Sequence, residues 1–102
     1  MDARTGVTAV CIGTLSCDVY LKNIPQTLMQ TDTTFARDVT LRIGAGAGAV
    51  AANLSRMGLC VQLAGRLGGD VFGSFVCGAL ERLGVNTDAV AREGTGGSAT
   101  NL

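Results

Sequence analysis

An unbroken run of glycine and alanine at positions 44–49 is the segment whose composition points most directly to chemistry. Gly44, Gly46 and Ala49 have the Gly-x-Gly-x-x-Ala spacing, and the run lies between a strand-like segment and a helix-like segment. Glycines at this spacing let a backbone approach a pyrophosphate group at the N-terminus of a helix. One interpretation is therefore a binding site for NAD(P) or FAD, in which Arg66, after the next strand, contacts the 2′-phosphate of NADP.

Three features of the sequence disagree with a dinucleotide site. Residues 35–43, before the turn, alternate between apolar and polar, whereas the first strand of a dinucleotide-binding fold is buried on both faces. The acidic ribose ligand, expected about 20 residues after the turn, is missing near residues 62–67. An earlier apolar strand, with Asp18 at its carboxyl end, has no role in that interpretation. A further alternative is that the small residues only let a helix pack closely against a sheet.

The segments around the turn predict alternating strands and helices. Residues 7–15 are almost continuously apolar, which is typical of a strand buried on both faces of a parallel sheet. Residues 47–57 have apolar groups at helical spacing, and Gly58 is placed to end that helix. Residues 59–64 form another mostly apolar strand, and Asp70 is placed to cap a second helix. This alternation predicts an α/β fold.

The composition excludes several classes of function. The chain of 102 residues has no net charge, and its charged residues are scattered singly, so we expect neither nucleic-acid nor membrane binding. It contains no histidine, which excludes Ser-His and Cys-His catalysis within it, and its four cysteines are not spaced like metal ligands, so we expect no metal site. Only 16% of the residues are charged and 47% are hydrophobic, which predicts that part of the surface is covered by more chain or by a partner.

The order of these segments closely resembles the amino-terminal third of the ribokinase family, the PfkB-type carbohydrate kinases. The most specific part is the pattern Gly-x-x-Gly-x-Asp-x-Phe-Gly, formed with Gly65, Gly68, Asp70 and Gly73, and the resemblance extends from about residue 9 to residue 102. It implies a Rossmann-like, three-layer α/β/α domain with a small β lid, of which this chain is the amino-terminal part. In that domain the three glycines shape the backbone, and Asp70 caps its helix.

The resemblance also implies a substrate site. The acid after the first strand, here Asp18, hydrogen-bonds the hydroxyl groups of the substrate, because an ionised carboxylate accepts from two hydroxyls at once. The backbone of the turn at Gly44, Ala45 and Gly46 approaches the same substrate.

The turn departs from the family pattern, which usually reads Gly-Gly-x-x-x-Asn. Its second glycine is replaced by Ala45, and its asparagine, whose side chain also contacts the sugar, is replaced by Ala49. Asn53, one helical turn further along, is a candidate to supply the missing amide.

The lid implied by the resemblance consists of residues 19–24, 35–43 and 87–102, with Asp88–Arg92 and Ser98–Leu102 as the strands of the last part. Its closure would exclude water from phosphoryl transfer. Because lids of this family often pair between subunits, we expect a homodimer formed through the lid.

We therefore expect a cytoplasmic kinase that transfers a phosphoryl group from ATP, with Mg²⁺, to a hydroxyl of a sugar or nucleoside. The catalytic base and the nucleotide site are expected beyond residue 102, within a Gly-x-Gly-Asp element that this chain lacks, so the chain alone is expected to be inactive. The alternatives are a fragment of an NAD(P)- or FAD-binding oxidoreductase and a non-catalytic fragment that acts through an exposed lid edge.

Overall fold

The structure is a computed structural model, and it describes residues 6–22, 38–44, 46–94 and 97–101. Six strands and two helices follow one another along these residues. Their bounds are β1 Ala9–Ile12, β2 Ser16–Lys22, β3 Asp38–Ile43, α1 Ala47–Arg56, β4 Val61–Gly68, α2 Val71–Arg82, β5 Asn86–Glu93 and β6 Ala99–Asn101. The strands form two separate three-stranded sheets.

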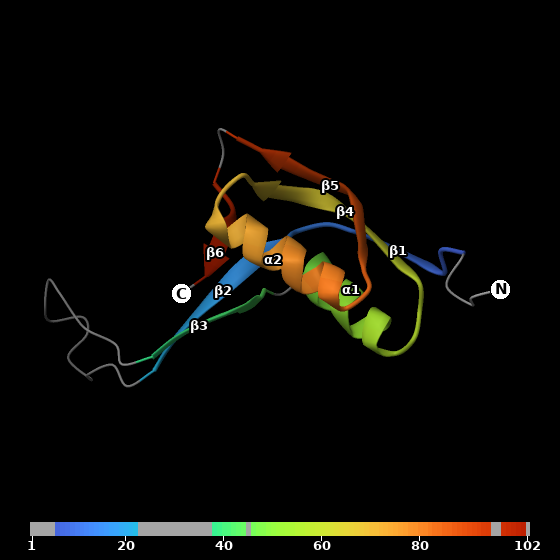
Figure 1. The fold of residues 1–102 in the computed structure, drawn as a ribbon, viewed down its shortest axis with the longest axis horizontal. Helices are drawn as coiled ribbons and strands as arrows, with labels where there is room; N and C mark the ends of the chain where they lie inside the picture. The colour runs from blue at the N-terminus through green and yellow to red at the C-terminus, as the bar shows by residue number, and fades with distance from the viewer. Residues whose placement is uncertain (1–5, 23–37, 45, 95–96, 102) are drawn as a thin grey trace, which may run out of the picture.

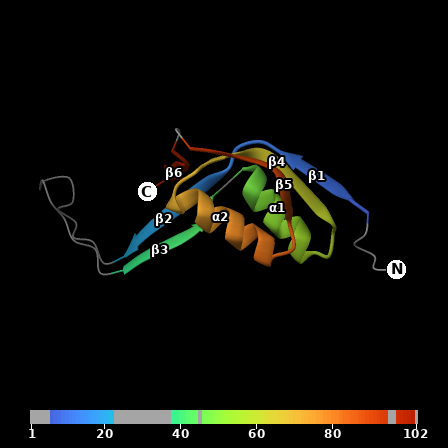
Figure 2. The same ribbon diagram turned by 45° about the horizontal axis from the view of Figure 1, so that its top comes forward.

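The main sheet is parallel and has the strand order β1-β4-β5. Each connection between neighbouring strands of this sheet contains a helix. A helix is needed because the chain must cross back to the end of the sheet where the first strand began before a parallel strand can start. Figures 1 and 2 both show α1 and α2 on the same side of this sheet. The described residues therefore have the α/β architecture predicted from the sequence.

The second sheet has the order β3-β2-β6, with β2 antiparallel to β3 and parallel to β6. Figure 1 shows β2 and β3 running away from the main sheet as a two-stranded arm. Of the strands expected in a lid, β2, β3 and β6 lie in this sheet, but Asp88–Arg92 does not. Those residues belong to β5, which pairs with β4 in the main sheet. The expectation was wrong because a strand that follows a crossover helix is placed beside the strand that precedes it.

The first strand also differs from its prediction, since β1 is shorter than residues 7–15 and is buried on one face only. Cys11 is buried, whereas Val10 and Ile12 are 58% and 77% exposed. Successive side chains of a strand point to opposite faces, and α1 and α2 lie on the same side of the sheet. An apolar run alone could not distinguish a strand with one covered face from a strand with two.

A single apolar cluster joins the two sheets through α2. Its largest fully buried side chains come from β4, α2 and β2, and they are Leu63, Leu67, Leu80, Val61, Val76 and Cys17. α2 contacts strands of both sheets, which fixes the second sheet against the main one. Neither described helix is long and apolar enough to cross a membrane.

Replacing Leu80 with alanine is expected to lower the free energy of unfolding by about 2–5 kcal/mol, because it leaves a cavity in this cluster. Chemical denaturation of the purified protein measures the change. Val71→Ala is the control on the same helix, since Val71 is 74% exposed and its truncation is expected to change stability by about 0.5 kcal/mol or less. Equal losses in the two variants would contradict this description of the core.

Candidate functional site

Asp18 lies on β2, the central strand of the second sheet, and not at the end of the main-sheet strand β1. In the register of this sheet it is paired with Arg42 of β3 on one side and Asn101 of β6 on the other. Its side chain is half-buried. The carboxylate is therefore held by a strand with neighbours on both sides, which is a more rigid support than a loop.

Gly44, the first residue of the Gly/Ala turn, contacts the segment that carries Asp18. Its backbone N–H donates to the carbonyl oxygen of Ser16 at 2.8 Å. A Cβ atom at position 44 would overlap Ser16 Oγ, and it would lie 2.9 Å from Asp18 Oδ1 and 3.0 Å from Ser16 O, which is closer than most Cβ atoms approach such neighbours. Glycine is therefore required for the turn to pass beside the carboxylate.

The next part of the turn, around Gly46, is held against the loop that joins β1 to β2. Gly46 has φ 95°, a conformation that favours glycine, and Ala47 N donates to Thr14 O at 3.0 Å. α1 begins immediately after Gly46, and no side chain caps its first turn. The N-terminus of α1 is thereby placed next to the start of the Asp18 strand.

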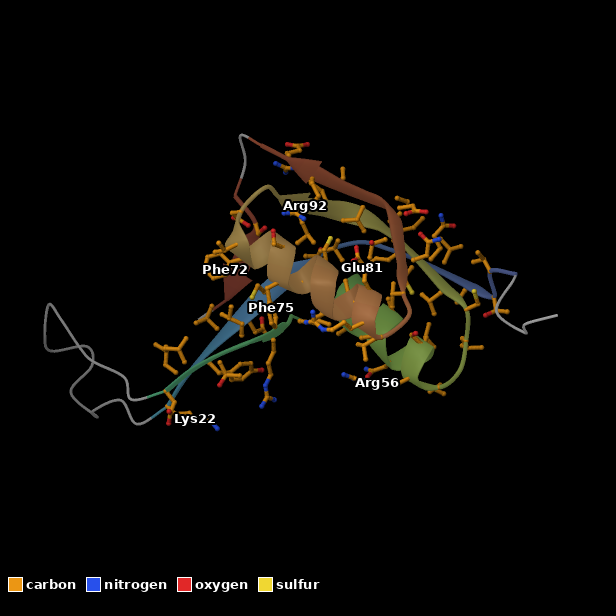
Figure 3. The ribbon with its side chains drawn as sticks, viewed as in Figure 1. Lys22, Arg56, Phe72, Phe75, Glu81 and Arg92 are labelled. Atoms are coloured by element: carbon orange, nitrogen blue, oxygen red, sulfur yellow. The ribbon has the colours of Figure 1, made fainter. Side chains whose placement is uncertain are left out.

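The other residues predicted for the substrate site are placed differently. Ala45 lies outside the described residues. Ala49 is half-buried in the first turn of α1. Asn53 is exposed, and its amide oxygen accepts from Arg56 Nη1 at 3.3 Å, so the structure does not bring this side chain to Asp18. Figure 3 shows Arg56 at the end of α1 that is remote from β2.

The glycines at 65 and 68 belong to β4, which extends beyond the predicted strand 59–64. At Gly65 a Cβ atom would lie 2.8 Å from Leu15 Cδ1 and 2.9 Å from Gly13 O, so this glycine lets the β1–β2 loop pack against β4. At Gly73, a Cβ atom would overlap Gly68 O. Gly65 and Gly73 are therefore required by close packing, and neither is placed beside Asp18.

Asp70 caps α2 and also binds the segment that leads into β6. Its Oδ1 accepts from Gly73 N at 2.9 Å and from Ser98 Oγ at 2.7 Å, and its Oδ2 accepts from Ser98 N at 2.8 Å. Ser98 Oγ in turn accepts from Gly68 N at 2.9 Å. One carboxylate therefore links the end of β4, the start of α2 and the start of β6.

Arg92 of β5 reinforces the same junction. Its Nε donates to Gly68 O at 2.9 Å, and its Nη2 donates to Ser74 Oγ at 3.0 Å. Figure 3 shows this side chain between β5 and the start of α2. Sequence reasoning missed Arg92 and Ser98 because an isolated arginine and an isolated serine carry no spacing signal. The residues to which each of them bonds are distant from it in the sequence.

The hydrogen bond from the side chain of Ser98 is the main reason that the pKa of Asp70 is lowered from 3.8 to about 2, with the N–H groups of Ser98 and Gly73 adding to it. Replacing Ser98 with alanine is therefore expected to raise the pKa of Asp70 toward 3.8. Titration of the carboxyl carbon by NMR measures this pKa. Ser74→Ala is the control, because the hydroxyl of Ser74 accepts from Arg92 and is not bonded to Asp70.

The same shift gives a pH dependence of stability with a definite sign. Because the pKa of Asp70 is lower in the folded state, its contribution is fully present above pH 3.8 and is lost as the pH falls through about 2. The thermal unfolding curves of wild type and Asp70→Asn are therefore expected to approach each other as the pH falls from 3.8 to about 2. Curves that stay equally far apart from pH 5 to pH 2 would show that Asp70 does not make this contribution.

Comparison with protein families decides the identity of this arrangement. Residues 8–102 match the family model described as pfkB family carbohydrate kinase. The chain belongs to this family. The resemblance on which the sequence interpretation rested is thereby confirmed.

Solved structures of two fructokinases and a ribokinase are similar in fold to this chain. A fructokinase from Halothermothrix orenii is 27% identical, with a TM-score of 0.73 over 90% of this chain and 31% of that chain. A fructokinase with bound ATP from Xylella fastidiosa is 28% identical, with a TM-score of 0.74 over 90% of this chain and 28% of that one. A ribokinase from Cryptococcus neoformans, solved with ADP, is 24% identical, with a TM-score of 0.77 over 93% and 29%, and shows the fold alone.

The pfkB segment described here spans less than a third of the length of these structures. A comparison with curated protein sequences finds no match. The ribokinase-type α/β fold predicted from the sequence is confirmed by the structural similarity.

The dinucleotide interpretation of the Gly/Ala turn does not agree with this fold. In a dinucleotide-binding unit the glycine-rich turn follows a strand of the parallel sheet. Here the turn follows β3, which is antiparallel to β2 and lies in the second sheet. In this pfkB segment the turn instead packs beside the Asp18 carboxylate.

Proposed function

We propose that this chain forms the acceptor-binding part of a kinase that transfers the γ-phosphoryl group of ATP to a hydroxyl of a sugar or nucleoside. The observation that carries the proposal is the placement of Asp18 on the central strand of the second sheet, against Gly44, in a chain of the pfkB family. Such a kinase needs a compartment that contains ATP, and we therefore propose that it acts in the cytoplasm.

The role proposed for Asp18 is to bind and orient the acceptor. An ionised carboxylate can accept hydrogen bonds from two neighbouring hydroxyls, and these charge-assisted bonds fix the direction in which a third hydroxyl points. Holding the attacking oxygen in one orientation lowers the entropic cost of phosphoryl transfer. The second sheet, which carries Asp18, is proposed to act as a lid that excludes water from the bound acceptor.

The solved relatives support ATP as the proposed donor, because the Xylella fastidiosa fructokinase contains bound ATP and an Arabidopsis thaliana ribokinase is complexed with ribose and ATP. In phosphoryl transfer generally, Mg²⁺ neutralises the charge that develops on the phosphate oxygens. Among the described residues there is no group of three or more acidic or cysteine side chains that could hold a metal ion. No residue of this chain is therefore assigned to Mg²⁺.

The proposal is tested by measuring ADP formation by the natural protein that contains this chain, with ATP, MgCl₂ and each of D-fructose, D-ribose and adenosine. Acceptor-dependent ADP release is expected with at least one sugar or nucleoside. A reaction without acceptor measures ATP hydrolysis and is the control. Absence of acceptor-dependent ADP release, together with tight binding of NADP, would support the oxidoreductase alternative instead.

The homodimer expected from the resemblance is proposed on the edge of the second sheet. β3 forms one edge of this sheet among the described residues, and its Val39 is 63% exposed. An exposed edge strand with apolar side chains can pair with the same edge of a second copy. Sedimentation velocity is expected to give a dimer, and Val39→Lys is expected to shift it toward monomer. A non-catalytic protein acting through this edge would dimerise in the same way but release no ADP.

A further inference from the structure

The second sheet has a face opposite to α2 that is defined by the register of β2 and β3. In this antiparallel pair Asp18 is opposite Arg42 and Tyr20 is opposite Thr40. Directly opposed side chains lie on the same face of a sheet. These four residues therefore form one surface, called here the acceptor face. The alternate residues of the same strands, such as Cys17 and Leu41, pack into or against the core.

Arg42 is the cation directly opposite Asp18 on the acceptor face, and its position is fixed by an aromatic ring. The same register places Lys22 and Asp38 on this face two pairs further along the strands. The centre of the Arg42 guanidinium group lies 5.0 Å from the centroid of the Tyr20 ring, which is within the range of a cation–π contact. Stacking of this kind occupies the flat face of a guanidinium and leaves the N–H groups at its edge available for hydrogen bonds. Arg42 and Tyr20 are both exposed, so a ligand can reach these N–H groups.

The acceptor face thus combines two kinds of recognition at neighbouring positions. Opposed residues on antiparallel strands have Cβ atoms about 5 Å apart, so Asp18 and Arg42 can contact different groups of one small molecule. The carboxylate accepts from hydroxyls, whereas the guanidinium donates two parallel hydrogen bonds to a carboxylate or phosphate. Asp18 alone would repel an acceptor with an anionic group, and Arg42 offsets that repulsion.

We infer that Arg42 is a specificity-determining residue that selects an acceptor carrying both hydroxyls and an anionic group, either a carboxylate or a phosphate. This inference deepens the proposed kinase function and rests on it. The proposed kinase would then act on a sugar acid or a sugar phosphate in preference to the corresponding neutral sugar.

A purely structural role for Arg42 makes a different prediction. Cross-strand pairs contribute modestly to a sheet, about 0.2–1 kcal/mol, and their loss would disturb Asp18 in the same way for every acceptor. A recognition role affects anionic acceptors selectively. The ratio of kcat/KM between an anionic acceptor and its neutral counterpart therefore separates the two roles.

The test uses the complete natural protein with ATP, MgCl₂ and three matched pairs of acceptors, which are D-gluconate with D-glucitol, D-fructose 6-phosphate with D-fructose, and D-ribose 5-phosphate with D-ribose. In at least one pair the anionic member is expected to have a kcat/KM about tenfold or more above that of its neutral partner. The first pair reports a carboxylate and the other two report a phosphate. Calorimetric titration of the same pairs without ATP gives the preference in binding alone.

Arg42→Gln is expected to lower that ratio by about tenfold or more, through KM rather than kcat, and Arg42→Lys is expected to lower it less because lysine keeps the charge but not the paired donors. Lys22→Gln is the matched control for loss of one positive charge, since Figure 3 shows Lys22 at the far end of β2. It is expected to leave the ratio unchanged. If Arg42→Gln fails to fold, Arg42→Lys decides, and an unchanged ratio in that variant overturns the inference.

The two proposals fail in distinguishable ways. Equal kcat/KM values within every pair, or an Arg42→Gln effect that is the same for both members of a pair, overturns the inference and leaves the kinase function standing. Absence of transfer to every acceptor overturns the kinase proposal and the inference together. An Asp18→Asn variant with unchanged activity overturns the role of Asp18 in binding the acceptor, and with it the inference, but leaves the kinase function standing.

Discussion

Replacing Asp18 with asparagine is expected to lower kcat/KM for the acceptor by about 100- to 10,000-fold. Asparagine preserves the size of the side chain but removes the charge and one acceptor oxygen. Each hydrogen bond to a charged group contributes about 1.5–3 kcal/mol, and two such bonds correspond to this range. Steady-state kinetics of the natural protein with its preferred acceptor measures the loss.

The control for this variant is Asp88→Asn, which makes the same chemical change on β5 of the main sheet. Asp88 is exposed and belongs to a different sheet from Asp18. Its replacement is expected to leave kcat/KM within about twofold, because surface changes away from a site have small effects. Similar losses in the two variants would mean that Asp18 acts through the overall charge and does not contact the acceptor.

Replacing Gly44 with alanine is expected to lower kcat/KM by about 100-fold while the protein stays folded. The added Cβ atom would overlap Ser16 Oγ and would lie 2.9 Å from Asp18 Oδ1 and 3.0 Å from Ser16 O, so the Ser16 side chain must move together with the turn or the carboxylate. A displacement of about 1 Å of a positioning group can reduce a rate by about two orders of magnitude. Kinetics together with a circular dichroism spectrum separates loss of activity from loss of fold.

Gly78→Ala is the control for the added methyl group. Gly78 lies within α2, and a Cβ atom there would have Arg82 Nη1, the end of a flexible side chain, as its neighbour at 3.4 Å. Alanine is also favoured over glycine inside a helix, by about 1 kcal/mol. This variant is therefore expected to be as active as wild type and at least as stable. An active Gly44→Ala variant would show that the turn does not constrain Asp18.

Much of the fold could be predicted because local patterns determine the helices. The expected helix at 47–57 agrees with α1, Ala47–Arg56, since helical spacing and the glycine after it are both local signals. The expected cap at Asp70 is the N-cap of α2. Assignment of strands to sheets was less accurate, because pairing depends on distant residues. Asp88–Arg92 was placed in the wrong sheet, because the sequence of a short strand does not determine which strand it pairs with.

The candidate site was predictable only in part, and for a related reason. The order of a strand, an acid and a glycine-rich turn suggested Asp18 and Gly44, which the structure places in contact. Asn53 was expected to reach the site, but a helical periodicity does not determine the rotamer of an exposed side chain, and its amide faces Arg56. The role that we infer for Arg42 had no signal in the sequence, because that role depends on a cross-strand register that β2 and β3 adopt only in the folded protein.

The pairing of β2 with β6 has a consequence for the order in which the parts of the chain fold. Asp18 is synthesised before Asn101, its register partner on β6, which lies about 80 positions later in the chain. Contacts between such distant positions form slowly, because a long loop must close before they stabilise anything. The strand that carries Asp18 therefore acquires its second neighbour only after α1, β4, α2 and β5 have been made. The proposed acceptor site is thus completed late in the folding of this chain, and an acceptor present during refolding is expected to stabilise the stage at which β6 joins β2.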